Sequence, residues 1–297
     1  MRYRFAFGLG RSGTTLLGRL LALTSAPARF VSELCPGIGD RIPNPAFMVE
    51  PGDAVATRRV REAIIDLGFG KSPFCEAQSH RIERDDPDAE VLLIKDIHSL
   101  LAYREIVSGL EDWRAVVVTR NPLRSLDSYF HGHTPKIRRY LVEEYKYLAT
   151  HLEAEGGDAM LARAASTTPP GVLRYMRRPR LFTTELFRQA AVTEFMCHFL
   201  GAWAAADDRI TQVTFEDLCR DPLGETLRLF DFLGLEYDDE TLAKLHRMTT
   251  GSSSEYYATD KNSALILEQP YKYLGSRNRR RLAEFLDDGS NSKEQSR

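Results

Sequence analysis

The sequence predicts an α/β protein with three layers, in which helices flank a central parallel sheet. Short apolar runs alternate with longer segments of helical period, a pattern typical of parallel strands joined by helices. A chain of 297 residues with 43% hydrophobic content can also bury a large core. A glycine-bounded turn lies between the first apolar run and the first helical segment, which adds a P-loop-like feature to the fold class.

The predicted strands and helices follow one another along the chain. Short, largely apolar runs predict buried strands at 3–7, 91–94, 115–118 and 210–213. Segments of helical period predict helices at 56–67, 99–110, 122–130, 184–205, 222–233 and 239–248. Pro122 falls in the first turn of its helix, where its missing N–H costs no hydrogen bond. The second half of the chain is therefore expected to be mostly helical.

No linker-like tract divides the chain, so the sequence predicts a single domain over residues 1–288. Residues 132–184 are predicted to form an insert in this domain, and the polar residues 289–297 a flexible tail. Within the insert, TTPPGVLRYMRRPR at 167–180 combines prolines with four arginines, which predicts a loop or lid.

Composition excludes several classes of function. The formal net charge is -2, which argues against a basic nucleic-acid-binding surface, and no apolar stretch approaches the ~20 residues of a membrane-spanning helix. The short apolar run after Met1 does not predict a signal peptide. The cysteines are far apart without metal-ligand spacing, so we expect a reduced, cytoplasmic protein with no metal site. They are Cys35, Cys75, Cys197 and Cys219.

The first glycine-bounded turn, GLGRSGTTLL at 8–17, has the spacing of a phosphate-binding loop. Such a turn presents backbone N–H groups and the positive end of a helix dipole to an anion. Thr14 stands where nucleoside triphosphatases have the lysine that reaches the β- and γ-phosphates. The loop therefore predicts a site for one phosphate, with backbone donors from Ser12, Gly13, Thr14 and Thr15.

Residues 11–17, RSGTTLL, resemble the loop [R/K]-S-G-T-T-x-L of sulfotransferases that use 3′-phosphoadenylyl sulfate (PAPS). The motif style is most similar to that of tyrosylprotein-type and bacterial members. The resemblance implies that the loop receives the donor's 5′-phosphosulfate, with Arg11 as the cation, and that the product is the bisphosphate PAP. No γ-phosphate would then need a lysine.

Two further stretches carry the resemblance. Arg120 and Ser128 have the spacing of the arginine and serine that hold the donor's 3′-phosphate in this family. Arg120 ends a predicted strand, where open α/β sheets bind ligands. VTFEDLCRDPLGETLRLFDFLG at 213–234 is similar to the family's later strand and helix, which implies a place for Phe215 against the adenine. A core position is the other interpretation of Phe215.

Sulfuryl transfer requires a base for the acceptor's proton and cations for the charge on the leaving oxygen. Arg11 and Lys95 are the candidate cations. Glu33 is the favoured base because it lies near the position of the catalytic glutamate in tyrosylprotein-type enzymes, and His98 is the next candidate. Asp96 competes as base, or orients Lys95 or caps a helix. In the family's C-terminal loop, Lys261 or Lys272 is a candidate phosphate contact.

The resemblance implies a soluble PAPS-dependent sulfotransferase of the EC 2.8.2 type, without a metal or redox cofactor. It would transfer a sulfuryl group to a hydroxyl, less favourably an amine, of a small molecule or saccharide. No nucleic-acid partner or membrane insertion is expected. A P-loop kinase that uses Asp96 as its acidic partner is one alternative, and a non-catalytic nucleotide-binding module is another. The sequence leaves the acceptor and the oligomeric state open.

The insert is predicted to wall the acceptor pocket, because substrate loops are usually carried at the ligand-bearing edge of the sheet. Tyrosines offer flat apolar faces, and arginines offer forks directed at anions. The residues concerned are Tyr140, Tyr145, Tyr147 and Tyr175 together with Arg174, Arg177, Arg178 and Arg180. The alternative is that the arginines pair with acids such as Glu143 and Glu144 and that the tyrosines are core.

Overall fold

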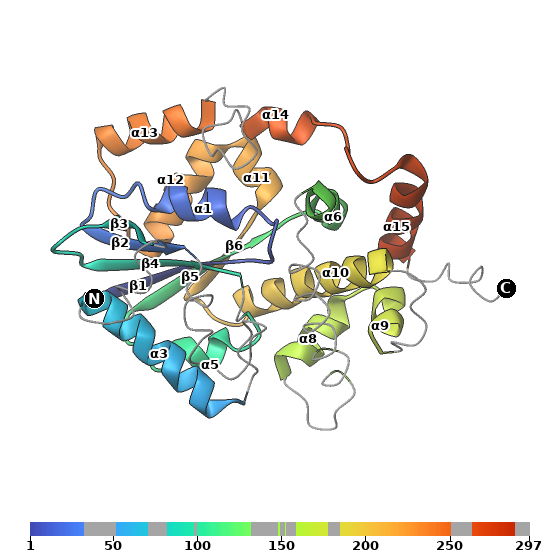
Figure 1. Cartoon of the computed structure of the whole chain (residues 1–297), viewed down its shortest axis with the longest axis horizontal. Helices are drawn as coiled ribbons and strands as arrows, with labels where there is room; N and C mark the ends of the chain where they lie inside the picture. Colours follow the sequence, from blue (N-terminus) through green and yellow to red (C-terminus); the bar gives the residue numbers. More distant parts are fainter. Residues whose placement is uncertain are drawn as a thin grey trace. The chain divides into compact units, whose positions relative to one another are not determined.

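The computed structural model describes residues 1–32, 52–70, 82–97, 100–131, 148, 152, 159–177, 185–250 and 263–288. Within these ranges the chain folds as two compact units (Figure 1). Unit 1 comprises Met1–Val118 and Arg209–Gln269, and unit 2 comprises Thr119–Asp208 and Pro270–Arg297. A single domain over 1–288 stays a prediction.

Unit 1 is built on a six-stranded sheet with the order β3-β2-β4-β1-β5-β6. The strands are β1 (Arg2–Phe7), β2 (Ala28–Ser32), β3 (Ile82–Asp85), β4 (Val91–Asp96), β5 (Trp113–Thr119) and β6 (Ile210–Thr214). β1 pairs in parallel with β4 and β5, and β2 pairs in parallel with β4, whereas β3 runs antiparallel to β2. The four predicted strands are confirmed as β1, β4, β5 and β6.

The strands β2 and β3 were not predicted. β2 is buried throughout, yet Arg29 interrupts its apolar pattern. That guanidinium is accommodated by Asp85 on β3, 2.6 Å from its Nε. β3, IERD, alternates between half-buried and exposed residues, and three of its four side chains are charged. Short charged strands at a sheet edge carry little hydrophobic signal.

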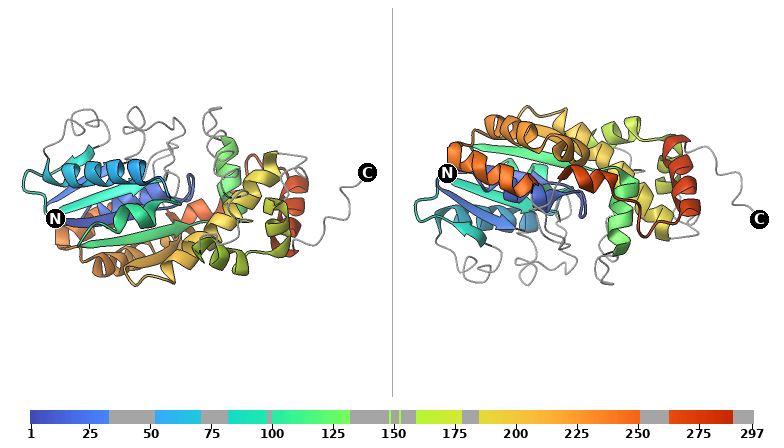
Figure 2. Two further views of the ribbon diagram at one scale, coloured as in Figure 1. Left: turned by 90° about the horizontal axis from the view of Figure 1, so that it is seen from below. Right: turned by 90° about the horizontal axis from the view of Figure 1, so that it is seen from above.

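Helices cover both faces of the sheet in unit 1 (Figures 1 and 2). On one face lie α3 (Ala54–Phe69) and α5 (Tyr103–Val107). On the other lie α1 (Thr14–Leu21), α11 (Phe215–Arg220), α12 (Pro222–Leu233), α13 (Asp239–Thr250) and α14 (Ser263–Glu268). The prediction of an α/β protein with a mostly parallel sheet between helix layers is confirmed.

Local sequence signals explain where several of these helices begin and end. Asp53 accepts hydrogen bonds from the N–H groups of Val55 and Ala56 at the start of α3, and Gly70 ends it in the left-handed conformation. The predicted helix at 99–110 is shorter in the structure, where it is α5. The Ser108 hydroxyl donates to the Glu105 carbonyl at 2.8 Å, which competes with continuation of the helix.

Unit 2 is helical. Its helices are α6 (Pro122–His131), α8 (Ala159–Thr167), α9 (Pro170–Arg177), α10 (Glu185–Ala204) and α15 (Ser276–Asp288). α10 packs against the other four, and its residues 190–192, 195 and 196 are apolar and fully buried. A helix that is apolar on several sides is suited to the centre of a helical unit.

The loop or lid predicted at 167–180 is wrong for the greater part of that stretch, because Pro170–Arg177 forms α9. Pro170 occupies the first helical position, and Val172 and Met176 are buried one turn apart. Tyr175 is buried and contacts the rings of Phe187 and Phe285, so it belongs to the core and not to an exposed pocket wall.

Arg174 and Arg177 are exposed on α9. The other predicted pocket residues, Tyr140, Tyr145, Tyr147, Arg178 and Arg180, lie outside the described residues, as do Glu143 and Glu144. None of the helices in the described ranges combines the length and apolarity needed to cross a membrane.

Candidate active site

The predicted phosphate loop connects β1 to α1 through a backbone with two left-handed residues. Arg11 has φ 69° and Gly13 has φ 99°. The first conformation is uncommon for a residue with a side chain, and the second suits glycine. Gly8 is also required by close packing, because a Cβ there would lie 2.5 Å from the Val118 carbonyl oxygen. The sequence pattern of the loop therefore matches a specific backbone shape.

Ser12 closes this loop from inside. Its hydroxyl donates to the Leu9 carbonyl at 2.6 Å, and its N–H donates to the same oxygen at 3.1 Å. Ser12 is only 3% exposed, as expected for a hydroxyl used within the turn. In this conformation the Ser12 N–H already donates to the Leu9 carbonyl. Its role in holding a phosphate therefore stays a prediction.

The N-terminus of α1 has no side-chain cap. The first helical hydrogen bond runs from the Leu17 N–H to the Gly13 carbonyl at 3.1 Å. The N–H groups of Thr14 and Thr15 precede that bond, so the helix offers them no partner of its own. No acidic side chain lies in the first turn. This end of α1 is therefore electrostatically suited to an anion.

Phe215, the first residue of α11, packs on the loop. A Cβ built at Gly13 would overlap the Phe215 ring and lie 2.8 Å from its Cε2 atom. The ring is buried within the core cluster that also contains Leu17 and Val116. The structure thus places Phe215 both in the core and against the phosphate loop, and contact with an adenine stays a prediction.

Lys95 and Asp96 end β4 and point to opposite faces of the sheet. Lys95 pairs with Ala6 of β1, and its Cβ would lie 3.1 Å from a Cβ built at Gly18 of α1. The Asp96 carboxylate accepts the Tyr103 hydroxyl at 2.9 Å on the α5 side, and the Ile97 N–H at 2.8 Å. Lys95 is 1% exposed and Asp96 0%. Lys95 therefore lies beneath the helix that follows the loop, whereas Asp96 faces away from that helix.

The two favoured base candidates, Glu33 and His98, lie outside the described residues. Their neighbours in the sequence are described. Ser32, which precedes Glu33, is the last residue of β2 and pairs with Lys95. Across the described residues, no three His, Cys, Asp or Glu side chains are grouped to hold a metal ion.

The second predicted phosphate site lies in unit 2. Arg120 follows β5 directly and is half-buried, and its carbonyl accepts a hydrogen bond from the Cys197 thiol at 3.8 Å. Asn121 caps α6 by accepting the N–H groups of Leu123 and Arg124 at 3.0 and 3.3 Å. Ser128 is half-buried within this helix. The predicted helix and the position of Ser128 in it are confirmed.

Asp127, beside Ser128, was not singled out from the sequence. Its carboxylate accepts three consecutive backbone N–H groups, from Lys272 at 3.0 Å and from Tyr273 and Leu274 at 2.8 Å. Burial acts to raise the pKa of Asp127, but these three hydrogen bonds and Arg124 outweigh burial and lower the pKa. Because Asp127 and its partners are about 145 residues apart, no local sequence pattern reveals their contact. Lys272 is therefore tied to α6, while Lys261 lies outside the described residues.

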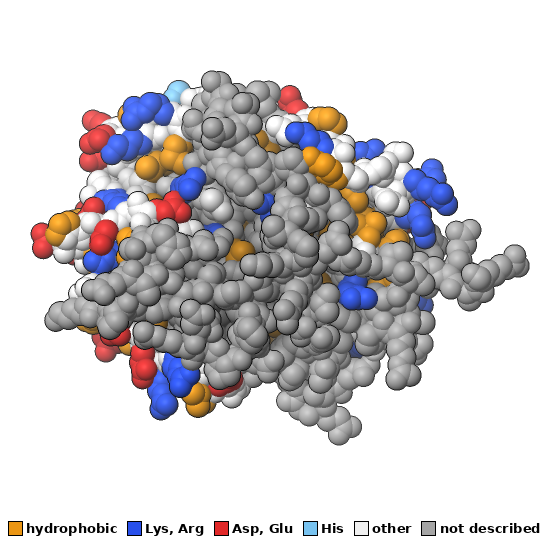
Figure 3. All heavy atoms as spheres, viewed as in Figure 1, with side chains coloured by type: hydrophobic (Ala, Val, Ile, Leu, Met, Phe, Trp, Pro, Cys, Tyr) orange, Lys and Arg blue, Asp and Glu red, His pale blue; other side chains and the backbone are white. Residues whose placement is uncertain are grey.

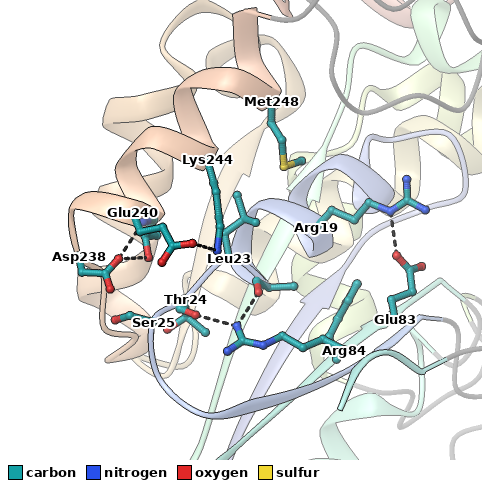
Figure 4. Close-up of a pocket in the computed structure, with 13 residues that line it drawn as sticks. Arg19, Leu23, Thr24, Ser25, Glu83, Arg84, Asp238, Glu240, Lys244 and Met248 are labelled. Atoms are coloured by element: carbon teal, nitrogen blue, oxygen red, sulfur yellow. Dashed lines mark hydrogen bonds and ion pairs between the residues drawn. The ribbon is translucent and has the colours of Figure 1, made fainter. Parts of the chain in front are cut away.

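A pocket of about 590 Å³ lies at the other end of α1 from the phosphate loop (Figure 4). Four of its charged side chains form two ion pairs. Arg19 contacts Glu83 at 2.8 Å, and Lys244 contacts Glu240 at 2.8 Å. The pocket contains none of the predicted catalytic or donor-binding residues, so we do not assign it to the transfer reaction.

The fold and the loop together define an α/β protein with a P-loop-like fold. The family model described as "Sulfotransferase domain" matches residues 5–265, and the chain belongs to this family, whose general reaction is sulfuryl transfer. No curated protein matches the chain in sequence.

Several solved structures resemble it. One is a mouse sulfotransferase complexed with PAP, 13% identical, covering 99% of this chain and 86% of that one with a TM-score of 0.42. Another is the sulfotransferase domain of the Synechococcus olefin synthase, 16% identical, covering 96% and 94% with a TM-score of 0.46. A Mycobacterium tuberculosis sulfotransferase is 17% identical, covering 90% and 75% with a TM-score of 0.37. The family assignment rests on the match over 5–265.

Proposed function

We propose that the protein transfers the sulfuryl group of PAPS to a hydroxyl of a small molecule or saccharide, with an amine as the less favoured acceptor. The observation that carries this proposal is the loop before α1. It combines an uncapped helix N-terminus with Arg11 and has threonine where nucleoside triphosphatases have lysine. Such a loop suits one phosphate bearing a sulfuryl group and lacks the lysine with which nucleoside triphosphatases reach the third phosphate.

The proposed donor contacts follow the family resemblance. The loop residues Arg11, Ser12, Gly13, Thr14 and Thr15 would receive the 5′-phosphosulfate. Arg120 and Ser128 would receive the 3′-phosphate, for which a guanidinium fork is well shaped. Phe215 would lie near the adenine, and its packing on Gly13 supports a position next to the donor.

The proposed reaction is one in-line displacement. The acceptor oxygen attacks sulfur, its proton passes to a carboxylate base, and the bond from sulfur to the 5′-phosphate oxygen breaks to release PAP. Charge accumulates on that leaving oxygen, so cations held near it lower the barrier. Lys95 supports this role because it is buried below α1, one strand away from the loop. Arg11 is the second cation.

Glu33 is the proposed general base, with His98 as the competing candidate. Ser32, the residue before Glu33, is paired with Lys95, so the carboxylate follows a strand that ends level with this cation. Asp96 is a poor base for the same reaction, because both of its oxygens accept hydrogen bonds from the chain and it faces α5. That orientation also argues against Asp96 as the magnesium-holding acid of a kinase.

The donor is tested by binding and turnover. The protein should bind PAP without magnesium and ignore ATP, whereas a kinase would require magnesium and bind ATP. Incubation with PAPS and a panel of acceptors, followed by mass spectrometry, should show one added sulfuryl group on a hydroxyl. Tight PAP binding without turnover of any acceptor would instead support a non-catalytic module.

The base is tested by two variants measured with the identified acceptor. Glu33→Gln should leave PAP affinity nearly unchanged and lower kcat by roughly a hundredfold, within the range of general-base catalysis. His98→Asn should have a much smaller effect. A damaging His98→Asn change combined with an active Glu33→Gln variant would assign the base to His98.

A further inference from the structure

The C-terminal part of the chain enters unit 2 at Pro270, and its first residues there form hydrogen bonds with α6. We name residues 270–274 the 270–274 segment. Its three consecutive N–H groups, from Lys272 to Leu274, converge on the Asp127 carboxylate at 2.8–3.0 Å. Hydrogen bonds to an ionised acceptor are about twice as strong as neutral ones. Asp127 therefore links this segment to α6 through three charge-assisted hydrogen bonds.

A second contact holds the same segment. The guanidinium of Arg124 lies 4.2 Å from the centre of the Tyr271 ring, and that of Arg279, on α15, lies 4.8 Å from it. Tyr271 thus joins α6 and α15 through two cation–π contacts, which keep two arginines close together despite their like charge. The segment is held at adjacent residues by independent interactions.

The surroundings of the 270–274 segment are strongly basic. Arg124 and Ser128 are four residues apart on α6, which places them on one face of the helix. The first turns of α15 carry Arg277, Arg279 and Arg280 and no acid, although positive charge is unfavourable at a helix N-terminus. Figure 3 shows Lys and Arg side chains gathered at the edge where α15 lies. Lys272 is also exposed.

The negative charge of Asp127 is by itself unfavourable in a basic region that is proposed to bind a phosphate. A carboxylate next to Ser128 repels a bound phosphate. The repulsion of a phosphate is reduced here because the carboxylate accepts three N–H groups and lies near the positive charge of Arg124. The position of the acid is explained if holding the segment matters more than the repulsion.

We propose that Asp127 is a positioning residue that fixes the 270–274 segment on α6 and thereby gathers Arg124, Lys272 and Arg279 around Ser128 as a 3′-phosphate subsite. The proposal rests on the proposed PAPS-dependent function. It assigns Asp127 no contact with the donor and no part in the transfer of the sulfuryl group.

The test compares two nucleotides that differ in the 3′-phosphate. Calorimetry would measure the affinity of the wild-type chain and of Asp127→Asn for PAP and for adenosine 5′-monophosphate. Asp127→Asn should weaken PAP binding roughly tenfold, the size expected for the loss of about one well-placed contact, and leave the monophosphate unchanged. A residue that acts only through its charge would have the opposite effect, because removal of a negative charge strengthens phosphate binding.

Amide hydrogen exchange of Lys272, Tyr273 and Leu274 in the same variants reports the segment directly. Asp127→Asn should lose protection at these amides while α10 keeps its protection. Asp53→Asn is a matched control, because Asp53 also accepts two backbone N–H groups but lies in unit 1. It should change neither the exchange nor the ratio of the two nucleotide affinities.

A second pair of variants tests the ring. Tyr271→Phe keeps both cation–π contacts and should retain wild-type discrimination, whereas Tyr271→Leu should lose part of it. Released amides with unchanged PAP affinity, or an increased PAP affinity in Asp127→Asn, would overturn the proposal. If the wild-type chain binds neither nucleotide, the proposed function fails, and that result is distinct from a wild-type chain that binds PAP with an unaffected Asp127→Asn variant.

Discussion

The phosphate loop of unit 1 and the α6 region of unit 2 are both predicted to hold a phosphate of one donor, yet they are built differently. The loop takes its shape from the backbone: two left-handed residues, a serine bonded inward, and a glycine beneath the Phe215 ring. The α6 region takes its shape from side chains, because the Asp127 carboxylate accepts backbone N–H groups and the Tyr271 ring is in cation–π contact with two arginines.

This difference predicts different vulnerabilities. A backbone-built site fails when a Cβ or a changed dihedral angle is introduced, and it is insensitive to moderate changes of pH. A site built from charged side chains tolerates changes of shape but responds to protonation. The two regions can therefore be separated by the kind of substitution that damages each.

The largest effect is expected from Gly13→Ala. The new Cβ would overlap the Phe215 ring at a residue with φ 99°, so steric strain adds to backbone strain. We expect a loss of about 3 kcal/mol in the free energy of unfolding, measured by urea denaturation, together with loss of PAP binding.

Gly52→Ala separates the two causes. Gly52 has a similar φ of 85°, but a Cβ there would meet nothing within 4 Å. This variant should lose only about 1 kcal/mol and keep PAP binding. Equal losses in the two variants would show that the Phe215 contact does not matter for the loop.

The second largest effect is expected from Arg11→Ala, compared with Arg120→Ala. In the proposed reaction the 5′-phosphate gains charge during transfer, whereas the 3′-phosphate is bound equally before and during the reaction. Arg11→Ala should therefore lower kcat roughly a hundredfold at saturating donor. Arg120→Ala should raise the donor KM roughly tenfold with kcat nearly unchanged. Similar kcat losses in both, with unaltered donor binding, would contradict this division of roles.

A smaller effect is expected from Ser12→Ala. The variant leaves the buried Leu9 carbonyl with one hydrogen bond fewer, which should cost about 1 kcal/mol in the free energy of unfolding. Thr15→Ala, at an exposed position of the same turn, is the control and should cost little. If Ser12→Ala is as stable as wild type but binds PAP more weakly, the hydroxyl serves the donor and not the loop.

The smallest effect concerns pH and belongs to the α6 region. The pKa of Asp127 is lowered from 3.8: burial acts to raise it, and the three N–H groups outweigh burial. Because the pKa of Asp127 is lower in the folded state, its ionised form stabilises the fold at pH values above its ordinary pKa. This stabilisation is lost as the pH falls through the pKa of the folded state.

The stability difference between wild type and Asp127→Asn should be about 1 kcal/mol at neutral pH, since the group is partly exposed. It should disappear as the pH falls below 3.8. Urea denaturation of both proteins across this range measures the difference and cancels the other acids. A difference that stays constant down to the lowest pH would show that the ionised carboxylate is not what holds the 270–274 segment.

The sequence alone determined the features that depend on local pattern. The strand predicted at 91–94, which is β4, and the helix predicted at 222–233, which is α12, follow from apolar periodicity and capping, which act over a few residues. The glycine-bounded turn between β1 and α1 was predicted for the same reason, since its glycines and its place between strand and helix are contiguous. Phosphate binding by this turn stays a prediction. The spacing of Arg120 and Ser128 also lies within one strand–helix connection.

The tertiary structure decided the contacts between distant parts of the chain. Only the β4 register and the neighbouring helices show that Lys95 faces α1 while Asp96 faces α5. Only the folded chain brings Asp127 to amides 145–147 residues later, or Phe215 onto Gly13. Such contacts arise from global packing, and their residues carry no local preference that reveals the partner. The helix at 170–177 belongs with them, because its buried side chains need Phe187 and Phe285 to form a core.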